Sequence, residues 1–465
     1  MKGMTLDAMA KACHGQLFGA NAMQFLNAMG IVIDSRKIHA GYVFVAIKGE
    51  RFDGHDFIEQ VFNDGALAVV SEKYLDIPGK PYILVESTHQ ALKDLAALYR
   101  SLLDIKVVGI SGSVGKTSTK EMIASVLQQK YNVHKTEGNH NNEIGLPLTI
   151  FKMEEEHQVA VLEMGISEFE EMHRLAEIAK PDVAVITNIG QCHLETLKDR
   201  DGILKAKTEM FDHLQENAAV VLNGDDDKLC TVLDVQGKEP VFYGVGTEKP
   251  DNAVYKEKTV YADDIQNLGL SGIQLDIHTK GESFSAHIPI PGTHNVYNAL
   301  AAAAVGKIMG LTNDEIKTGI EQVQMIDGRT NMIHVNGKII IDDCYNANPV
   351  SMKAALDVIS TASGRTIAVL GDMNELGEEK KALHYEVGTY LAAKNIDVLF
   401  CTGELCKELA RAVREHSQIC EVYEFASKYK MIGELLRFLK EGDAVLVKAS
   451  HFMGFSDVVE AIITT

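Results

Sequence analysis

The stretch GISGSVGKTSTKEM, residues 109–122, carries the strongest indication of the fold. Gly112 and Gly115 let the backbone turn so that successive N–H groups face a phosphate, and Lys116 adds a positive charge. Thr117 opens the helical pattern that follows, where its hydroxyl can bind Mg²⁺. The stretch therefore predicts a strand, a phosphate-binding loop and a helix, with an ordinary glycine-rich turn as the alternative.

Apolar runs that stop at Gly, Asn, Asp or Glu surround this loop, as is typical of buried parallel strands in α/β proteins. The first series comprises residues 106–112, 159–165, 183–190 and 219–225. A second series comprises residues 338–344, 366–373, 397–403 and 444–450. The carboxyl ends of such strands are where ligands usually bind. The gap between the two series predicts two separate sheets in two separate domains.

Other segments complete an α/β chain of three domains. A strand is predicted at 65–72, antiparallel strands are predicted within 251–292, and a buried helix is predicted at 296–311. At about 150 residues per domain, a chain of 465 residues suggests three domains. We place them at residues 1–101, 102–326 and 327–465.

Composition limits the class of protein. The 45 Lys and Arg against 65 Asp and Glu give a formal charge of -20, which argues against a nucleic-acid partner. Seven cysteines, an odd number without a CxxC pair, make a disulfide framework unfavourable and fit a reducing cytoplasm. No run approaches the roughly 18 apolar residues of a membrane span, and the N-terminus lacks the apolar core of a signal peptide. We expect a cytoplasmic monomer without membrane insertion.

The phosphate-binding loop serves several protein classes, and other motifs narrow the choice. A switch GTPase needs a guanine-reading NKxD, which the sequence lacks. The strand at 159–165 ends with Glu163, a single carboxylate suited to Mg²⁺ or an ordinary residue at a strand end. The late run TIAVLGDMNELG, residues 366–377, lacks the GxGxxG of an NAD-binding unit. A nucleotide-regulated binding module that performs no chemistry remains an alternative.

Further motifs occur in order along the whole chain, and together with the loop they resemble the Mur ligases, the ATP-dependent amino-acid-adding enzymes of peptidoglycan synthesis. They are DSR (34–36), FDGHDF (52–57), GNHNNEIG (138–145), LEMG (162–165), NIGQCHLE (188–195), KAK (205–207), GTHNVYNALAA (292–302), DGRT (327–330), DDCYNANP (342–349) and LGDMNELG (370–377). The resemblance implies a small N-terminal α/β domain that binds a UDP-sugar and a central domain with a P-loop-type, mostly parallel sheet and helices. It also implies a C-terminal Rossmann-like α/β domain that closes over ATP and binds the incoming dipeptide.

Three motifs resemble one branch of that family. GNHNNEIG, DDCYNANPVSMKAAL and VLGDMNELG are similar to the ligases that add D-alanyl-D-alanine to UDP-N-acetylmuramoyl-tripeptide through an acyl phosphate, releasing ADP and phosphate. The ligases that add a single third amino acid to UDP-N-acetylmuramoyl-dipeptide usually carry a histidine in the segment corresponding to DDCYNANP, and their diaminopimelate-adding members have a DNPR motif. Neither feature is present here. Those ligases remain the alternative enzyme. Folylpolyglutamate synthases share the loop but should lack the DSR and DGHDF unit.

The resemblance implies a site for ATP and two Mg²⁺ ions. Thr117 and Glu163 would bind one ion and His193 would help to bind the second, although Mg²⁺ prefers oxygen to imidazole. In the family a lysine matching Lys207 is carbamylated by CO₂, which turns a cation into an anion able to bind metal. Lys205 is the neighbouring candidate, and either lysine considered alone could be a solvated helix residue. The implied catalytic residues are Lys116, Glu163, His193 and Lys207.

The resemblance also implies which residues contact ATP. Asn298 would read the adenine, and Asn295 shares its helical face, although both could instead satisfy a buried turn. Arg329 could reach the phosphates, and Asp343 suits ribose hydroxyls. Asn346 and Asn348 lie in the adjoining turn, where an ordinary Asx-Pro turn would also explain Asn348-Pro349. The complete implied set is Ser111, Gly112, Ser113, Val114, Gly115, Lys116, Thr117, Asn295, Asn298, Arg329, Asp343 and Asn346.

Two groups of residues are expected to bind the muramoyl substrate. The first lies in the N-terminal unit, where arginine suits a diphosphate through its planar fork. It comprises Ser35, Arg36, Lys48, Asp53 and His55. The second is a run of short polar side chains that a turn-rich loop would also favour. It comprises Thr136, Asn139, Asn141 and Asn142.

Overall fold

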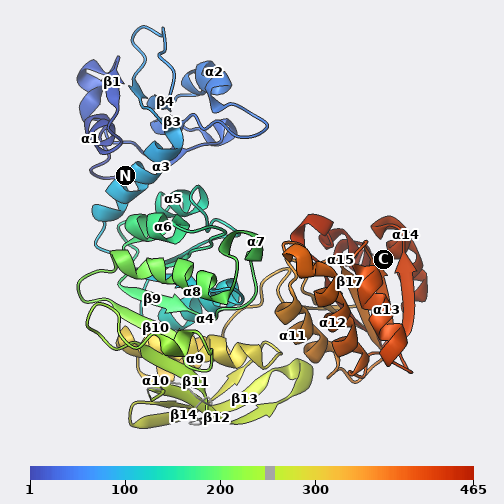
Figure 1. Ribbon diagram of the computed structural model, residues 1–465. Helices are drawn as coiled ribbons and strands as arrows, with labels where there is room; N and C mark the ends of the chain where they lie inside the picture. Colours follow the sequence, from blue (N-terminus) through green and yellow to red (C-terminus); the bar gives the residue numbers. More distant parts are fainter. Residues whose placement is uncertain (247–256, 465) are drawn as a thin grey trace. The chain divides into compact units, whose positions relative to one another are not determined.

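The computed structural model describes residues 1–246 and 257–464 of the chain (Figure 1). They form a mixed α/β protein with sheets of five, nine and six strands, which confirms the predicted fold class. Packing divides the chain into two compact units. One unit comprises Met1–Ser111, Tyr131–Ala184 and Lys207–Ala218, and the other draws on Gly112–Lys130, Val185–Ala206 and Ala219–Thr465.

The first sheet lies in the N-terminal part of the chain. Its strand order is β1-β5-β4-β3-β2, and only the β1–β5 pair is antiparallel. The strands are β1 (Gln16–Phe18), β2 (Gly30–Val32), β3 (Tyr42–Val45), β4 (Ala68–Ser71) and β5 (Tyr82–Leu84). Helix α3 (Thr88–Ser101) follows the sheet and begins after Ser87, whose side chain caps it. The strand predicted at 65–72 is β4.

The second sheet contains the strand that enters the phosphate-binding loop. Its order is β14-β13-β12-β11-β10-β9-β6-β8-β7. The strands β6 (Lys106–Ser111), β8 (Val159–Glu163), β9 (Val183–Ile186) and β10 (Ala219–Asn223) begin at the four predicted positions. Each ends before the end of its predicted run because the last polar or glycine residues turn out of the sheet. Strands β7 (Val133–Lys135) and β11 (Val241–Val245) extend the sheet without having been predicted.

The far side of this sheet is antiparallel, as predicted. Strands β12 (Val260–Asn267), β13 (Ile273–Thr279) and β14 (Glu282–Ile288) pair antiparallel, and β13 alternates buried and half-buried residues. Residues 251–256 of the predicted segment lie outside the described residues. The predicted helix is α9 (His294–Ile308), which packs on α4 (Lys116–Leu127), the helix after the loop.

The third sheet has the order β15-β16-β20-β17-β18-β19. Only β15 (Asn331–Val335) is antiparallel; the other strands are β16 (Lys338–Asp342), β17 (Thr366–Gly371), β18 (Val398–Thr402), β19 (Glu421–Phe425) and β20 (Ala444–Lys448). One face packs on α11 (Pro349–Ile359), α12 (Lys380–Ala392) and α13 (Cys406–His416). The other face packs on α14 (Lys428–Phe438) and α15 (Ser456–Ile463). The four strands predicted here are all present.

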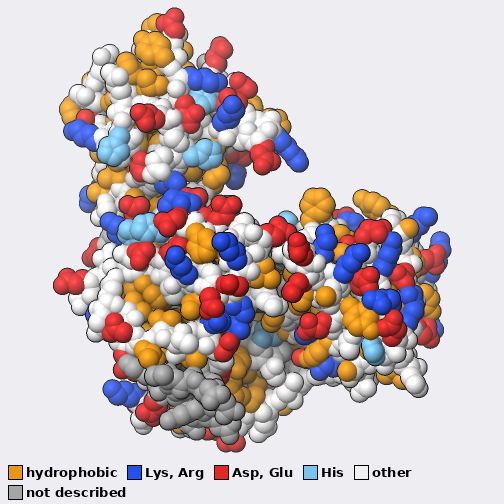
Figure 2. Space-filling view, in the orientation of Figure 1, with side chains coloured by type: hydrophobic (Ala, Val, Ile, Leu, Met, Phe, Trp, Pro, Cys, Tyr) orange, Lys and Arg blue, Asp and Glu red, His pale blue; other side chains and the backbone are white. Residues whose placement is uncertain are grey.

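Two further features of the described residues are the distribution of surface charge and the character of the helices. On the face of the described residues that Figure 2 shows, acidic and basic side chains are interspersed. Within residues 1–246 and 257–464, no helix combines the length and the apolar character needed to cross a membrane.

Candidate active site

The phosphate-binding loop requires its two glycines. Gly112 has φ +152°, and a Cβ there would lie 1.9 Å from Thr187 Oγ1. Gly115 has φ +81° and directly precedes α4. Lys116 Nζ donates to the Gly112 carbonyl at 2.8 Å, so the ammonium lies back across the loop. At the end of β6, the buried Ser111 Oγ has no hydrogen-bond partner among the described residues, as suits a group that binds a ligand.

The segment that follows β9, residues 187–190, holds the loop. The Val114 N–H donates to Asn188 Oδ1 at 2.9 Å, and Asn188 Nδ2 donates to the Val114 carbonyl at 2.9 Å. The Ser113 N–H donates to the Asn188 carbonyl at 3.1 Å, and the Gly190 N–H donates to Ser113 Oγ at 2.9 Å. The loop is thus shaped by contacts with a neighbouring strand end.

Glu163 ends β8, directly beside the strand that enters the loop. In the parallel β6–β8 pair, Ile110 is the register partner of Glu163. The Glu163 side chain is buried, and its Oε1 accepts a hydrogen bond from Asn141 Nδ2 at 2.9 Å. Its backbone N–H donates to Thr136 Oγ1 at 2.9 Å. A buried carboxylate in one fixed orientation fits a Mg²⁺ ion, which prefers oxygen donors.

The run of short polar residues before α5 (Gly145–Ile150) makes bonds within its own loop. Asn142 Oδ1 accepts from the Gly145 N–H at 2.8 Å and so satisfies the start of α5. Asn139 is exposed, and its Oδ1 accepts from Asn141 Nδ2 at 3.2 Å. Two of the four predicted substrate residues, Thr136 and Asn141, therefore orient Glu163. The other two shape the loop around it.

Glu143, in the same loop, was not singled out from the sequence. Its carboxylate accepts from Lys93 Nζ at 2.9 Å and from Arg174 Nε and Nη2 at 2.6 and 3.1 Å. Burial alone would raise the pKa of Glu143, but the hydrogen bonds from Arg174 and Lys93 bring it below its ordinary value. The partners lie 50 and 31 residues away along the chain, so no local pattern could have indicated this cluster.

The structure separates the two candidate lysines on α8 (Arg200–Thr208). Lys207 is 1% exposed, whereas Lys205 is exposed. Burying an ammonium is costly, so the solvated-helix alternative does not fit Lys207. His193 lies before α7 (Leu194–Leu197) with φ +50°, a backbone conformation uncommon outside glycine. Its Nδ1 lies 3.6 Å from Glu375 Oε2.

The two asparagines expected at the adenine belong to a buried hydrogen-bond chain. Thr119 Oγ1 donates to Asn298 Oδ1 at 2.8 Å, and Asn298 Nδ2 donates to Asn295 Oδ1 at 2.8 Å. Asn295 Nδ2 then donates to the Pro291 carbonyl at 2.9 Å. The chain links α4 to α9, so both residues do satisfy buried polar groups. They also lie near the loop, since a Cβ on Gly115 would be 3.5 Å from Asn298 Oδ1.

A small pocket lies beside the first turns of α4. Its lining includes Ser118, Glu121, His294, Asn295 and Arg329. Burial lowers the pKa of His294, which favours the neutral imidazole. The pocket brings together Asn295 and Arg329, two of the residues expected to contact ATP, whereas Asn298 lies behind them in the hydrogen-bond chain.

The residues expected at the third sheet lie at the carboxyl ends of its strands. Asp343 follows β16, and its Oδ2 accepts from Lys448 Nζ, at the end of β20, at 2.6 Å. Asp343 Oδ1 also accepts from the Thr330 N–H at 3.1 Å. The Arg329 guanidinium lies 4.2 Å from the centre of the Tyr345 ring. The buried Lys448 was not predicted, although the sequence shows it as the polar end of an apolar run.

Asn346 has a structural role in the turn after β16. Its Oδ1 accepts from the Ala347 N–H at 2.9 Å. The turn leads into α11, whose first residue is Pro349 and whose cap is Asn348, with Asn348 Oδ1 accepting from the Ser351 N–H at 2.8 Å. The Asn-Pro turn considered from the sequence is therefore a helix start.

In the N-terminal unit, Arg36 is oriented by Asp34. Its Nε and Nη2 donate to the two carboxylate oxygens of Asp34 at 2.9 and 2.8 Å. This pairing lowers the pKa of Asp34 to about 2. Ser35 and Arg36 lie in a short 3-10 helix after β2, and Arg36 is largely exposed. The bonds to Asp34 do not use Nη1 of the Arg36 guanidinium, so this group is available to bind an anion.

The FDGHDF motif forms a separate cluster. His55 Nδ1 lies 2.6 Å from Asp53 Oδ1, and His55 Nε2 accepts from the Glu72 N–H at 3.0 Å. Since Nε2 is an acceptor, Nδ1 carries the proton and donates to Asp53. Lys48 is exposed and pairs through its backbone with Asp53 in an isolated bridge. Asp53 and His55 thus stabilise a loop whose exposed edge includes Lys48.

Three models of the Mur ligase family match the chain. The Mur ligase family catalytic domain matches residues 27–100, the Mur ligase middle domain matches 110–306, and the Mur ligase glutamate ligase domain matches 328–451. A similar relative is the UDP-N-acetylmuramoyl-tripeptide--D-alanyl-D-alanine ligase of Bacillus subtilis, 37% identical over 439 residues and 93% of each chain.

Solved structures are similar over the same extent. A crystal structure of MurF from Acinetobacter baumannii has a TM-score of 0.87 and 30% identity, and the match covers 99% of both chains. The crystal structure of MurF ligase from Thermotoga maritima in complex with ADP has a TM-score of 0.81 and 30% identity, covering 94% of this chain and 97% of that one.

Proposed function

The chain belongs to the Mur ligase family, and we propose that it joins D-alanyl-D-alanine to UDP-N-acetylmuramoyl-tripeptide at the expense of ATP. The observation that carries the proposal is similarity over nearly the whole chain to a relative named for this reaction. The phosphate-binding loop and the ADP complex of the Thermotoga relative support the use of ATP. The ligase that adds a single third amino acid and the binding module without chemistry are not favoured.

The reaction needs an activated carboxylate, because a carboxylate does not condense with an amine in water. Transfer of the ATP γ-phosphoryl group to the terminal carboxylate of the tripeptide gives an acyl phosphate and ADP. The amine of D-alanyl-D-alanine then attacks the acyl carbon, and phosphate leaves. The protein's contribution is alignment and charge neutralisation more than a nucleophile of its own.

The loop residues are proposed to hold the ATP phosphates. The loop N–H groups, Ser111 Oγ and Lys116 Nζ are the donors, and Lys116 must exchange its bond to Gly112 for one to a phosphate oxygen. Asn298, with Asn295 on the same helical face, would hold the adenine, and Arg329 would reach the phosphates. The pocket beside α4, which Asn295 and Arg329 both line, supports this assignment. Asp343, fixed by Lys448, would accept from the ribose hydroxyls, and Asn346 keeps the adjoining turn in shape.

We propose two Mg²⁺ ions at this site. The buried Glu163 carboxylate and the Thr117 hydroxyl would bind one, and His193 and a carbamylated Lys207 would bind the second. When bound, the ions neutralise charge on the phosphate and carboxylate oxygens. Burial distinguishes Lys207 from the exposed Lys205, and a carbamate on Lys207 would be an anion among cations.

Substrate binding is proposed for the N-terminal domain and the loop before α5. Arg36, oriented by Asp34, would bind the diphosphate together with Ser35. Lys48 would also contact the UDP-sugar, and Asp53 and His55 would support the loop that carries Lys48. Asn139, which is exposed, would contact the muramoyl peptide directly. Thr136, Asn141 and Asn142 would support this binding by shaping the same loop.

We further propose three domains with the boundaries predicted from the sequence: residues 1–101, 102–326 and 327–465. The first would bind the UDP-sugar, the second ATP and the third the incoming dipeptide. The boundaries fall in the connections after α3 and before β15, between the strands of different sheets. We propose that the ligase acts as a monomer in the cytoplasm, where ATP is available.

The reaction is tested by phosphate release from ATP with UDP-N-acetylmuramoyl-tripeptide, with and without D-alanyl-D-alanine, followed by mass spectrometry of the UDP product. We expect sustained release to require both substrates and the product mass to rise by one dipeptide. The Lys116→Ala variant should release no phosphate. Release with UDP-N-acetylmuramoyl-dipeptide and a single amino acid would favour the neighbouring ligase, and release that no carboxylate substrate affects would favour the binding module.

A further inference from the structure

The peptide that holds the phosphate-binding loop is itself held from two sides. Residues 188 and 190 contact the loop, and Ile189 lies between them. The Ile189 N–H donates to Asp226 Oδ2 at 2.8 Å, and the Ile189 carbonyl accepts from Arg200 Nε at 2.8 Å. Asp226 follows β10 and Arg200 begins α8, so two other elements fix one residue of the segment.

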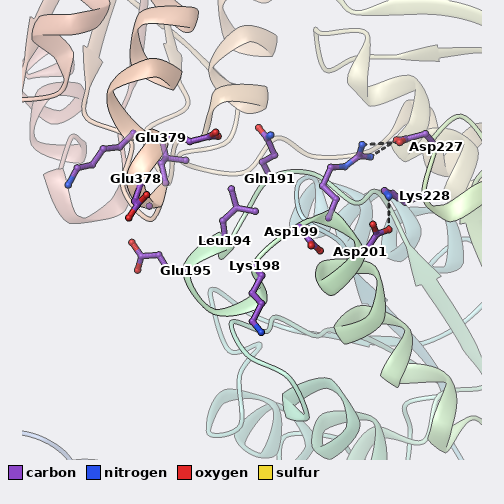
Figure 3. Close-up of a pocket in the computed structure, with 14 residues that line it drawn as sticks. Gln191, Leu194, Glu195, Lys198, Asp199, Asp201, Asp227, Lys228, Glu378 and Glu379 are labelled. Atoms are coloured by element: carbon purple, nitrogen blue, oxygen red, sulfur yellow. Dashed lines mark hydrogen bonds and ion pairs between the residues drawn. The ribbon is translucent and has the colours of Figure 1, made fainter.

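Arg200 is in turn fixed by a second carboxylate. Its Nη1 donates to Asp227 Oδ2 at 2.9 Å, and its Nη2 donates to the other oxygen of Asp227. Figure 3 shows this forked pair at Asp227, next to the pair between Lys228 and Asp201. A guanidinium can bind a carboxylate with one edge and a carbonyl with another, which a lysine ammonium cannot do in the same planar geometry.

Asp226 is equally well anchored. Its Oδ1 accepts from the Lys228 and Leu229 N–H groups at 3.0 and 2.9 Å, while its Oδ2 holds Ile189. Ile189 is therefore held by Asp226 directly and by Asp227 through Arg200, and its neighbours Asn188 and Gly190 bond to Val114 and Ser113 of the loop. All of these contacts lie within one compact unit.

We propose that Arg200 is a positioning residue for the nucleotide, which holds the 188–190 segment against the phosphate-binding loop. It touches no reacting atom. It acts through Ile189 on Ser113 and Val114, whose backbone would otherwise have more freedom to leave the phosphate-binding conformation. The inference rests on the proposed function in identifying the nucleotide as ATP.

The neighbouring ion pair supplies a matched control. Lys228 Nζ donates to Asp201 Oδ1 at 2.5 Å, and this pair joins the same two elements as Arg200 and Asp227. The Lys228 ammonium has no bond to the 188–190 segment in the hydrogen bonds described for it. Removing it should weaken the connection between the elements without releasing Ile189.

The test measures ADP binding by titration calorimetry for Arg200→Gln, Arg200→Lys and Lys228→Gln. We expect Arg200→Gln to weaken ADP binding about tenfold, the usual scale for losing a charged hydrogen bond. Arg200→Lys should weaken it nearly as much, because lysine can pair with Asp227 but not hold Ile189 as well. Lys228→Gln should stay within about twofold of the unmodified protein.

In turnover, Arg200→Gln should raise the KM for ATP and leave the KM for the UDP-substrate nearly unchanged. A double-mutant cycle with Ser113→Ala should be less than additive, because both changes act on the same contact. Equal ADP affinity in Arg200→Gln, equal losses in Arg200→Gln and Lys228→Gln, or full retention in Arg200→Lys would each overturn the inference.

These outcomes separate the inference from the proposed function. ADP binding does not require ligation, so weaker binding by Arg200→Gln would stand even if the protein made no peptide product. Conversely, normal ligation with unchanged ADP binding would leave the function standing and remove the role of Arg200. If Arg200→Gln does not fold, Arg200→Lys gives the same test, since it retains the charge beside Asp227.

Discussion

Glu163 ends a buried strand and Asp343 follows one, and each carboxylate is oriented by a neighbouring side chain. Asn141 donates to Glu163 at 2.9 Å, and Lys448 pairs with Asp343 at 2.6 Å. Groups held in this way need little rearrangement when a charged ligand binds, which is the general advantage of a preorganised site. Much of the polar sequence around them serves to orient these two groups.

A prediction for a single residue concerns Lys207. The Lys207→Ala variant should lose about 100-fold in ligation rate, the upper end of the range for losing a group that supports a metal site. Bicarbonate together with a small carboxylate such as acetate should restore part of the rate by supplying the missing anion. The measurement is phosphate release with both substrates present.

The matched control is Lys205→Ala, on the same helix but exposed. It should keep the activity of the unmodified protein. Full activity of Lys207→Ala without added carboxylate would contradict the assigned role, as would equal losses in the two variants.

The pKa of Asp34 supplies a pH prediction. The hydrogen bond from Arg36 lowers this pKa from 3.8 to about 2, so the folded state binds the Asp34 proton less readily than the unfolded state. The stabilisation is therefore complete above about pH 4 and is lost as the pH falls through about 2. Its size should be small, because the pair is exposed to solvent.

Carbon-detected NMR titration of the Asp34 carboxyl group should report this pKa directly. In the Arg36→Gln variant it should return toward 3.8. The same variant should raise the KM for the UDP-substrate more than the KM for ATP. An unchanged Asp34 pKa would show that the pair does not exist in solution.

At the scale of elements, short polar residues in the motifs begin helices. Asn142 satisfies the start of α5, and Asn348 caps α11 with Pro349 as its first residue. Helix α4 differs, because it follows Gly115 and has no side-chain cap. The start of α4 is therefore not occupied by a capping side chain, and a helix start attracts an anion such as phosphate.

Replacing glycine by alanine should have opposite effects in the phosphate-binding loop and in the exposed helix α14. Gly112→Ala should cost about 1–3 kcal/mol in local strain, because φ is +152° and the added Cβ would lie 1.9 Å from Thr187 Oγ1. ADP binding should fall accordingly. Gly433→Ala, in the exposed interior of α14 with nothing within 4 Å of the added Cβ, should stabilise by about 0.5–1 kcal/mol.

Titration calorimetry and thermal unfolding measure both effects. Normal ADP affinity in Gly112→Ala would mean that the loop rearranges when nucleotide binds. A lower unfolding temperature for Gly433→Ala would show that this glycine has a role beyond its helix.

At the scale of the whole molecule, the proposed binding groups come from all three proposed domains. An acyl phosphate must be kept from water, which domain closure around the substrates achieves in many enzymes. We therefore expect small-angle scattering to show a smaller radius of gyration with a non-hydrolysable ATP analogue and the UDP-substrate together. The bound value should approach about 23 Å, as for a compact chain of this length.

Either ligand alone should give less compaction than both, and Lys116→Ala should give little with the ATP analogue. An unchanged scattering profile with both ligands would argue against closure.

The sequence by itself determined the α/β class, the phosphate-binding loop, and the starts of the buried strands in two sheets. These features are local: an apolar run, a glycine and a Lys-Thr pair act on their immediate neighbours in the chain. Strands β7, β11, β15 and β19 were missed. In β7, β15 and β19 no residue is fully buried, so no apolar run marks them in the sequence.

Only the tertiary structure decided which polar residues are buried and what they bind. Lys205 and Lys207 are two residues apart, yet one is exposed and the other buried. Thr119 bonds to Asn298 across 179 residues of sequence. Arg200, on α8, bonds both to Ile189 after β9 and to Asp227 after β10. Such contacts depend on which segments the fold brings together, and local periodicity carries no record of partners that distant.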